Sequence, residues 1–403
     1  MRNLWDETAA QRCKSPLALR AYSSRLIGSD RTLVLHGGGN TSLKLGRTLY
    51  VKGTGADLAA VTEEHFTALD LAPLRALLQD EHLQDADMMR HVDSCKLEAA
   101  AARPSIEAPM HAILPHPCIE HAHADAILAV ANVDTCEQSC AAAFGDLAPV
   151  VPYHHSGAAL ARACKTVYDQ RATSRTIGLI LAFHGVVAFG GTLRESYANL
   201  QRLVGCAENF LQQRGAPPAV ASEHAVVEQA ASVETPATAR LRDAISTAAA
   251  FPMAMHVVCT PATLAYARRT DIAEISRQGP PTPQHAIYTR RVPLLGQDVT
   301  AYVTAYREYL GRTLGSVADG RIDPTPRIAL DPEFGLCAFG VSDRHAAIAA
   351  EIYLHDIDII TRASAHGTYR AASEQDMAHA ELEYGGFEQR VRTRIASGSS
   401  LTG

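Results

Sequence analysis

Three histidines have the spacing of a metal site. His121 and His123 are separated by one residue in a short apolar stretch, and His184 lies far along the chain, just before Gly185. If the stretch is a strand, His121 and His123 point to the same face, because side chains alternate along a strand. A third histidine from a neighbouring strand would complete a set of three ligands and leave a coordination position for substrate or water. The alternative is a pair of structural histidines beside an apolar strand.

A carboxylate with two possible roles precedes this stretch. Glu107 follows Pro104 and Ser105 and precedes Pro109, a pattern typical of the start of a helix. Glu107 either interacts with the helix dipole, or faces the metal, where it could be a ligand or a general base.

Two glycine-rich turns offer groups that bind anions. Backbone N–H groups and hydroxyls in such turns suit a phosphate or a carboxylate. Neither turn matches a nucleotide-binding fingerprint, and no GxSxG motif accompanies the HGGG sequence, which argues against a serine hydrolase. The candidate residues are Gly39, Asn40 and Ser42 in the first turn, Thr54 and Gly55 in the second, and Ser105.

The elements that must position these residues alternate between strands and helices, which is typical of an α/β fold. In the first half we expect strands over residues 32–36 and 48–52, a helix from residue 62, and a capped helix over 193–213. A segment rich in Ala, Pro, Ser and Glu follows, and we place a domain boundary near residue 220. Residues 1–220 would form the catalytic domain, and residues 221–403 a smaller α/β domain.

The second half has weaker signals. We expect short strands within residues 251–260, 286–293 and 327–339, and a helix over 342–365. His285 and Arg290 are the polar residues that stand out, as a binding cluster or as a salt-bridged strand edge. The sequence shows no internal repeat. This domain is expected to cap the site or to mediate contacts between subunits.

Composition excludes several classes of protein. The 403 residues carry 37 basic and 43 acidic side chains, so no basic field is present to bind nucleic acid or an anionic membrane. No apolar stretch is long enough to span a membrane, and the first residues lack a secretory signal, so we expect a cytoplasmic protein. Nine cysteines without a CxxC pair are typical of reduced thiols.

The order of motifs resembles the class II aldolase/adducin family. HGGGNTS, KGTG, PSIEAPMH, HAHAD, PYHHSG and FHGVVAFGGT follow one another over residues 25–215. The continuation, with TPQHAIYTRR and GLCAFGVSDRHAAIAAEIYLHDIDII, is similar to the aldolase half of bifunctional rhamnulose-1-phosphate aldolase/short-chain dehydrogenases up to about residue 392, without a dehydrogenase half. The resemblance implies an α/β/α domain around a mostly antiparallel sheet.

The resemblance also implies roles for residues. His121, His123 and His184 would hold Zn²⁺ or another divalent metal, with Glu107 as ligand and base. Tyr153 would donate a proton, reaching the site of a neighbouring subunit, in a homo-oligomer that the family's habit makes a tetramer. Asn40, Thr54, Gly55 and Ser105 would bind the phosphate.

Two positions depart from the family pattern. Ile106 replaces a second serine, which questions strict selection of phosphorylated substrates, and His154 and His155 follow Tyr153, either solvated or touching substrate.

The expected function is a metal-dependent carbon–carbon lyase of carbohydrate metabolism. It would cleave a ketose 1-phosphate, similar to rhamnulose 1-phosphate, or a related short ketose, to dihydroxyacetone phosphate and an aldehyde through an enediolate. Two alternatives stay open: an epimerase, dehydratase or decarboxylase of sugar or sugar-acid phosphates on the same site, and a non-catalytic adducin-like module.

Overall fold

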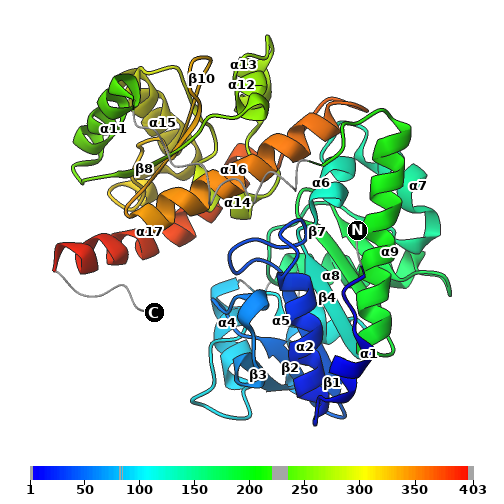
Figure 1. The fold of residues 1–403 in the computed structure, drawn as a ribbon. Helices are drawn as coiled ribbons and strands as arrows, with labels where there is room; N and C mark the ends of the chain where they lie inside the picture. Colours follow the sequence, from blue (N-terminus) through cyan, green and yellow to red (C-terminus); the bar gives the residue numbers. More distant parts are fainter. Residues whose placement is uncertain (1–2, 81–82, 84, 220–234, 398–403) are drawn as a thin grey trace. The chain divides into compact units, whose positions relative to one another are not determined.

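The computed structural model describes residues 3–80, 83, 85–219 and 235–397. Two compact units divide the chain. Unit 1 is Met1–Pro217 with Ala365–Gly367, and unit 2 is Pro218–Ser364 with Thr368–Gly403. In Figure 1, unit 1 runs from blue to green, and unit 2 runs from green to red.

Unit 1 is built around a seven-stranded sheet in the order β3-β2-β1-β4-β7-β6-β5. Neighbouring strands are antiparallel except β5 and β6, which are parallel. The strands are β1 (Asn40–Leu45), β2 (Thr48–Lys52), β3 (Phe66–Asp70), β4 (Cys118–Ala122), β5 (Val150–Val151), β6 (Gly178–Leu181) and β7 (Gly185–Gly190).

Helices cover both faces of this sheet. They are α1 (Glu7–Gln11), α2 (Pro16–Gly28), α3 (Leu71–Ala76), α4 (Asp85–Ser94), α5 (Ala108–Ile113), α6 (Asp125–Ala131), α7 (Cys136–Phe144), α8 (Ala158–Arg171) and α9 (Leu193–Gln213). Apolar side chains of α3, α4, α5 and α8 share one buried core with the sheet. On the other face, Arg20 of α2 and Ser196 of α9 both donate hydrogen bonds to Glu120 of β4. The expected α/β/α domain with a mostly antiparallel sheet is confirmed.

The element predictions for unit 1 hold in part. The strand at residues 48–52 and the helix at 193–213 are confirmed, and Thr192 caps that helix. Residues 32–36 are not a strand: the backbone turns there, with positive φ at His36, and the first strand begins at Asn40. The helix expected from residue 62 is also wrong, because Phe66–Asp70 pairs with β2 along its whole length.

Unit 2 contains a four-stranded sheet in the order β8-β11-β10-β9. Its strands are β8 (Ala254–Val258), β9 (Leu294–Leu295), β10 (Ile328–Asp331) and β11 (Gly335–Gly340). Its helices are α11 (Pro236–Ala249), α12 (Pro261–Ala267), α13 (Ile272–Ile275), α14 (Pro283–Thr289), α15 (Val299–Leu314), α16 (Asp343–Ala363) and α17 (Glu374–Ala396). Side chains of α11, α15 and α17 pack in one apolar core with the sheet.

One strand expected in unit 2 is a helix. Residues 286–289 lie in α14, since the side chain of Thr282 accepts a hydrogen bond from the backbone of His285, and Pro283 starts the first turn. Residues 290–293 form neither a helix nor a strand. The strands expected within 251–260 and 327–339 are present, and α16 occupies the helix expected at 342–365.

Unit 2 repeats the last four strands of the unit 1 sheet. The order β4-β7-β6-β5 corresponds to β8-β11-β10-β9, with antiparallel pairs followed by one parallel pair in both. The hairpin registers coincide: Leu181 pairs with Gly185 in unit 1, and Asp331 pairs with Gly335 in unit 2, 150 residues later. Strands β1 to β3 have no counterpart in the described part of unit 2.

The helices follow the same plan. Helices α9 and α16 both have 21 residues, and Thr192 and Ser342 cap them at corresponding positions. The expectation of no internal repeat is therefore wrong. The sequence signal is short, Gly-x-x-Ala-Phe-Gly at residues 185–190 and again at 335–340, and the rest of the repeat lies in spacing and strand order.

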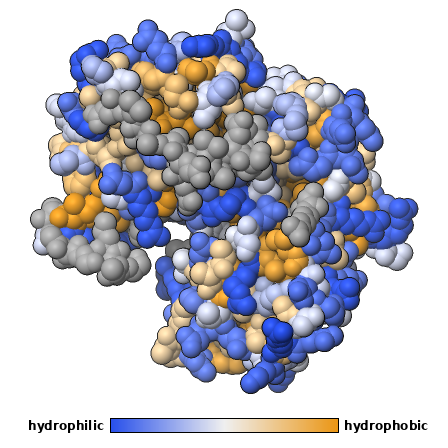
Figure 2. Space-filling view, in the orientation of Figure 1, coloured by the Kyte–Doolittle hydropathy of each residue, from blue (hydrophilic) through white to orange (hydrophobic). Residues whose placement is uncertain are grey.

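Within the described residues, no helix has the length and apolar character needed to cross a membrane. Figure 2 shows hydrophilic side chains over both units on the face that it draws, with hydrophobic residues in separate smaller patches. The large buried side chains instead belong to the cores of the two sheets.

Candidate metal centre

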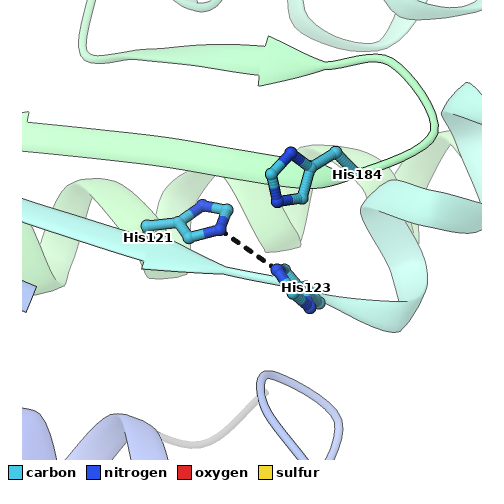
Figure 3. A group of neighbouring side chains, drawn as sticks. All are labelled: His121, His123 and His184. Carbon is cyan, nitrogen blue, oxygen red and sulfur yellow. Dashed lines mark hydrogen bonds between the residues drawn. The ribbon is translucent and has the colours of Figure 1, made fainter. Parts of the chain in front are cut away.

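The structure brings the three histidines together at one end of the unit 1 sheet. His121 lies in β4, His123 just beyond its end, and His184 in the turn between β6 and β7 (Figure 3). Their ligand atoms all lie within 4.8 Å of one another. The three residues are only 1%, 9% and 8% exposed. These three residues are the group of metal-ligating side chains found among the described residues.

Two glycines allow the neighbouring turns to approach β4 closely. Gly185 has φ +151°, and a Cβ there would lie 2.3 Å from the carbonyl oxygen of Ala122. Gly39 has φ +66°, and a Cβ there would lie 2.8 Å from the carbonyl oxygen of His121. Any other residue would clash with the backbone and strain its own φ. These glycines therefore set the distance between the turns and the histidines.

A backbone hydrogen bond orients His121. Its Nδ1 lies 3.0 Å from the carbonyl oxygen of Val186 in β7. A carbonyl can only accept, so Nδ1 carries the proton and Nε2 keeps its lone pair, which is the form that binds a metal. The Nε2 atoms of His121 and His123 lie 3.1 Å apart. Nitrogen ligands at 2.0–2.1 Å from a tetrahedral ion lie about 3.3 Å apart, so the spacing of this pair is close to that of two zinc ligands.

Glu107 completes the group from another part of the fold. It stands immediately before α5, at the N-terminus of that helix. Its carboxylate oxygens lie 3.4 Å from Nε2 of His121 and 3.2 Å from Nε2 of His184. Burial raises the pKa of Glu107, but the nearby histidines, His121 first, lower it more, so the pKa lies below its usual range. A carboxylate in this position can be a fourth ligand or a base.

Ser156 contacts Glu107 and was missed by the sequence analysis. Its hydroxyl donates a hydrogen bond to Oε1 of Glu107, 3.4 Å away. Ser156 belongs to the PYHHSG segment between β5 and α8, from which Tyr153, His154 and His155 were singled out, but not Ser156. Nothing in the sequence showed that this loop reaches Glu107, because 49 residues separate the two.

Some of the residues expected to bind an anion lie close to Glu107. The hydroxyl of Thr54 donates to the carbonyl of Pro104, and Gly53 and Pro104 form a β-bridge, so the second glycine turn lies against the segment before Glu107. The hydroxyl of Ser105 accepts a hydrogen bond from the backbone N–H of Glu107. A Cβ on Gly55 would meet nothing within 4 Å, so this turn leaves open space.

The first glycine turn is tied to β4. Asn40 pairs with His121 in the β1–β4 ladder, which places Gly39 and Asn40 next to the histidines. Ser42 is fully buried, and its hydroxyl lies 2.7 Å from Nδ1 of His111 in α5. Burial lowers the pKa of His111 to about 3, so this ring is neutral. The position of Ser42 suits support of α5 better than contact with a ligand.

Lys52 is a second group that the sequence analysis missed. Its ammonium donates hydrogen bonds to the carbonyls of Gly37 and Ala56, and so joins the two glycine turns. Burial lowers the pKa of Lys52 to about 8, against the opposite effect of Glu107. The lysine of KGTG, next to a glycine turn, was the available signal. Its ammonium places a positive charge at these turns.

Tyr153 lies beside the turn that holds His184. The ring of Tyr153 is 6.4 Å from that of Phe183, measured between centroids. Nδ1 of His155 lies 3.0 Å from the carbonyl of Ser156, and His154 is exposed. Tyr153 thus lies near Phe183, the residue that precedes His184.

Comparison with known proteins shows which family the chain belongs to. The model described as the class II aldolase and adducin N-terminal domain matches residues 19–211, and the model of the class II aldolase second domain matches residues 232–390. The solved N-terminal class II aldolase domain of a conserved protein from Thermoplasma acidophilum is 33% identical, over 52% of this chain and 99% of that domain, with a TM-score of 0.48. The chain belongs to the class II aldolase family. The resemblance seen in the motifs is confirmed.

Two further relatives of this class II aldolase family member differ in extent. The L-fuculose-1-phosphate aldolase from Thermus thermophilus is 18% identical, over 48% of this chain and 95% of that enzyme, with a TM-score of 0.34. A curated protein of Bacillus subtilis strain 168, the uncharacterized oxidoreductase YuxG, is 26% identical over 419 residues, which cover 94% of this chain. The chain spans 59% of the length of that relative.

The second unit of this class II aldolase chain lacks the histidine set. The strand registers make Val257 equivalent to His121, Cys259 to His123 and Phe334 to His184. None of these residues offers an imidazole.

The residues singled out in the second half have partners inside unit 2. Nδ1 of His285 lies 2.6 Å from Oδ1 of buried Asp356, and Arg290 pairs with Glu388 at 3.1 Å. Burial raises the pKa of Asp356, and His285 opposes this effect. Both His285 and Arg290 are therefore buried beside carboxylates, which favours a structural role, but in and after helix α14 and not at a strand edge.

Proposed function

We propose that the chain is a zinc-dependent aldolase that reversibly cleaves a ketose 1-phosphate, or a related short ketose, to dihydroxyacetone phosphate and an aldehyde. The observation that carries this proposal is the position of Glu107, with its carboxylate 3.2 and 3.4 Å from two histidines of a buried three-histidine group. Family membership supports aldolase chemistry for such a group.

His121, His123 and His184 would hold the metal, with Glu107 as a fourth ligand in the absence of substrate. A divalent ion bound there polarises a ketone oxygen and stabilises the charge that develops beside it. The hydrogen bond from His121 to the Val186 carbonyl keeps the ring in the metal-binding tautomer. The low exposure of the group limits access of water.

In the direction of synthesis, Glu107 removes a proton from the hydroxymethyl carbon of dihydroxyacetone phosphate. The carbon attacks the aldehyde carbonyl, and Tyr153 donates a proton to the aldehyde oxygen as it becomes a hydroxyl. Cleavage reverses both transfers. Tyr153 serves either its own site or that of a neighbouring subunit in the tetramer expected from the family.

The phosphate would bind between the two glycine turns. Gly39, Asn40, Thr54, Gly55 and Ser105 would contact the phosphate. The Lys52 ammonium, which donates hydrogen bonds to carbonyls of both turns, supports a place for an anion there. Ile106 packs against the apolar core of unit 1, so it adds no polar group to the pocket. With Ile106 in place of the family's second serine, the pocket has one hydroxyl fewer to bind phosphate. Whether the substrate must be phosphorylated therefore has to be tested.

The test is proton exchange at the hydroxymethyl carbon of dihydroxyacetone phosphate in deuterated water. The zinc-loaded full chain is measured with and without chelator, with unphosphorylated dihydroxyacetone in parallel. We expect exchange that stops on chelation and is faster with the phosphate. The Glu107→Gln variant should lose exchange, because the amide cannot accept the proton.

This half-reaction needs no knowledge of the aldehyde. Absence of exchange with either ketone, from protein shown to carry zinc, would contradict the aldolase proposal. The function would then be sought among decarboxylases and dehydratases acting on sugar-acid phosphates.

A further inference from the structure

The repeat exposes a difference at one edge of the unit 2 sheet. In unit 1, β4 has a partner on both sides, β7 and β1. In unit 2, the equivalent strand β8 pairs with β11 and is the last strand of its sheet among the described residues. The place that β1 fills beside β4 has no strand beside β8 in the described part of the chain. This edge carries backbone N–H and C=O groups able to pair with another strand.

Strand β8 lacks the features that usually protect an edge. Ala254–Val258 contains no charged residue and no proline, although Pro252 and Pro261 stand on either side of it. Soluble proteins commonly place lysine, proline or a bulge on an exposed edge, because an unprotected edge pairs with other chains. Ala254, Met255 and His256 are half-buried, and the last two residues of the strand are buried.

The central residue of β8, His256, also lacks a partner of the kind that the equivalent residue has in unit 1. His256 corresponds to Glu120, which accepts two hydrogen bonds from Arg20 of α2 in unit 1. Unit 2 has no equivalent of α2 among its described helices. Nε2 of His256 is buried without a hydrogen-bond partner in the described residues. In unit 1, β4 has a strand on both sides and Glu120 has hydrogen-bond partners. Among the described residues of unit 2, β8 has a strand on one side only, and Nε2 of His256 has no hydrogen-bond partner.

We propose that the free edge of β8 pairs with β8 of a second copy of this chain. Two antiparallel copies of β8 related by a two-fold axis would set His256 opposite itself, Met255 opposite Val257, and Ala254 opposite Val258. The strand is therefore self-complementary, with small and apolar residues facing one another and no like charges to separate the copies. The two four-stranded sheets would form one continuous sheet.

The test uses the full chain and two measurements. Analytical ultracentrifugation over a hundredfold range of concentration should show a dimer that dissociates on dilution, because a ladder of five residues is short. Hydrogen exchange should show alternate amides of β8 protected at high concentration and unprotected at low concentration. The second measurement needs no variant.

A matched pair of variants separates β8 from other surfaces. His256→Lys places a charge at the centre of the edge and should raise the dissociation constant at least tenfold. Leu295→Lys places the same charge on the opposite edge of the same sheet, at an exposed residue of β9, and should leave association unchanged.

Two results would overturn the proposal. One is a chain that stays monomeric at every concentration. The other is an oligomer in which the β8 amides exchange equally at high and low concentration, which would assign association to another surface. If His256→Lys does not fold, the exchange of the unmodified chain still decides between these outcomes. The inference does not depend on the metal site.

Discussion

Units 1 and 2 share a strand order, a hairpin register and two equally long helices, but only unit 1 has the histidine group in the described residues. In unit 2 the equivalent positions hold valine, cysteine and phenylalanine. The same strand order and register therefore occur with the three histidines and without them. The comparison shows that strand order and register alone do not create the histidine group, which depends on the side chains at three positions.

The two units also use buried charge differently. In unit 1, Glu107 lies among histidines at the candidate site. In unit 2, buried Arg290 lies near Glu381 and Glu388, within the packed helices. These charged groups of unit 2 contact one another within the packed helices, at 3.7 Å for Arg290–Glu381 and 3.1 Å for Arg290–Glu388.

The largest expected effect comes from equivalent positions in the two units. His123→Ala should remove most bound zinc and lower activity by on the order of 10³-fold, because a lost ligand removes several kcal/mol of transition-state stabilisation. Cys259→Ala, at the equivalent position of unit 2, should change neither. Zinc content and the exchange assay measure both. Equal losses in the two variants would show that unit 2 also takes part in metal binding.

The glycines that end the two hairpins should be equally sensitive. A Cβ on Gly190 would lie 2.7 Å from the backbone nitrogen of Ser196, and one on Gly340 would lie 2.3 Å from that of Ala346. Alanine at either position should lower the free energy of unfolding by about 3 kcal/mol through overpacking. Denaturant unfolding measures this change.

Two helical glycines are the controls for that pair. Gly205 in α9 and Gly311 in α15 have open space where a Cβ would lie, so alanine there should be neutral or stabilising by about 0.5–1 kcal/mol. A mild effect at Gly340 beside a large one at Gly190 would show that the strand-to-helix junctions of the two units are not equivalent.

Unit 2 should show a pH dependence that arises from Glu381. Burial raises the pKa of Glu381 to about 7, while Arg290 and the hydroxyl of Tyr306 oppose this effect. The folded state thus holds this proton more tightly than the unfolded state. Stability from this group is present at low pH, and falls as the pH rises from the unfolded pKa, near 4.5, to about 7.

Glu381→Gln keeps an acceptor for Tyr306 and removes the titration. We expect the variant to be more stable than the unmodified chain by about 2 kcal/mol at pH 8, and the difference to shrink towards pH 5. Unfolding at several pH values measures it, with Glu383→Gln as an exposed control on the same helix. A difference that grows towards low pH would show that the sign is wrong.

The smallest expected effect concerns Ser156. Its hydrogen bond to Glu107 is long, at 3.4 Å, so Ser156→Ala should cost about 1 kcal/mol and lower kcat about fivefold. Zinc content should not change, since Ser156 is not a ligand in this arrangement. Ser174→Ala, at an exposed position, is the control. A loss of zinc instead of kcat would show that Ser156 supports metal binding rather than the position of the base.

The sequence predicted most of this site and part of the fold. The His-x-His pair could be found because alternation along a strand is a local rule, and α9 because its cap and apolar spacing are local too. The helix expected from Thr62 failed because Phe66–Asp70 pairs with a strand of the same sheet, which no local pattern reports. The contact of Ser156 with Glu107 depends on the path of a loop, and was not accessible either.

The repeat is the feature that was hardest to find from the sequence, because the two units share their strand arrangement and few identical residues. Its sequence signal is four identical positions in a six-residue segment, while the register and order of four strands coincide. Apolar residues of similar size replace one another freely in a core, so the fold persists after the similarity of sequence has faded.

The bond between His121 and the Val186 carbonyl links coordination to strand pairing. The carbonyl of Val186 in β7 fixes the proton of His121 on Nδ1, and the backbone of His121 pairs with Val187 of the same strand. A slip of one residue between β4 and β7 would turn His121 to the opposite face and remove the carbonyl from its ring. If the proposed metal binds here, its affinity would depend on the register of these strands: a chain with misregistered strands would not bind it, and its release would be an early sign that the central strands are separating.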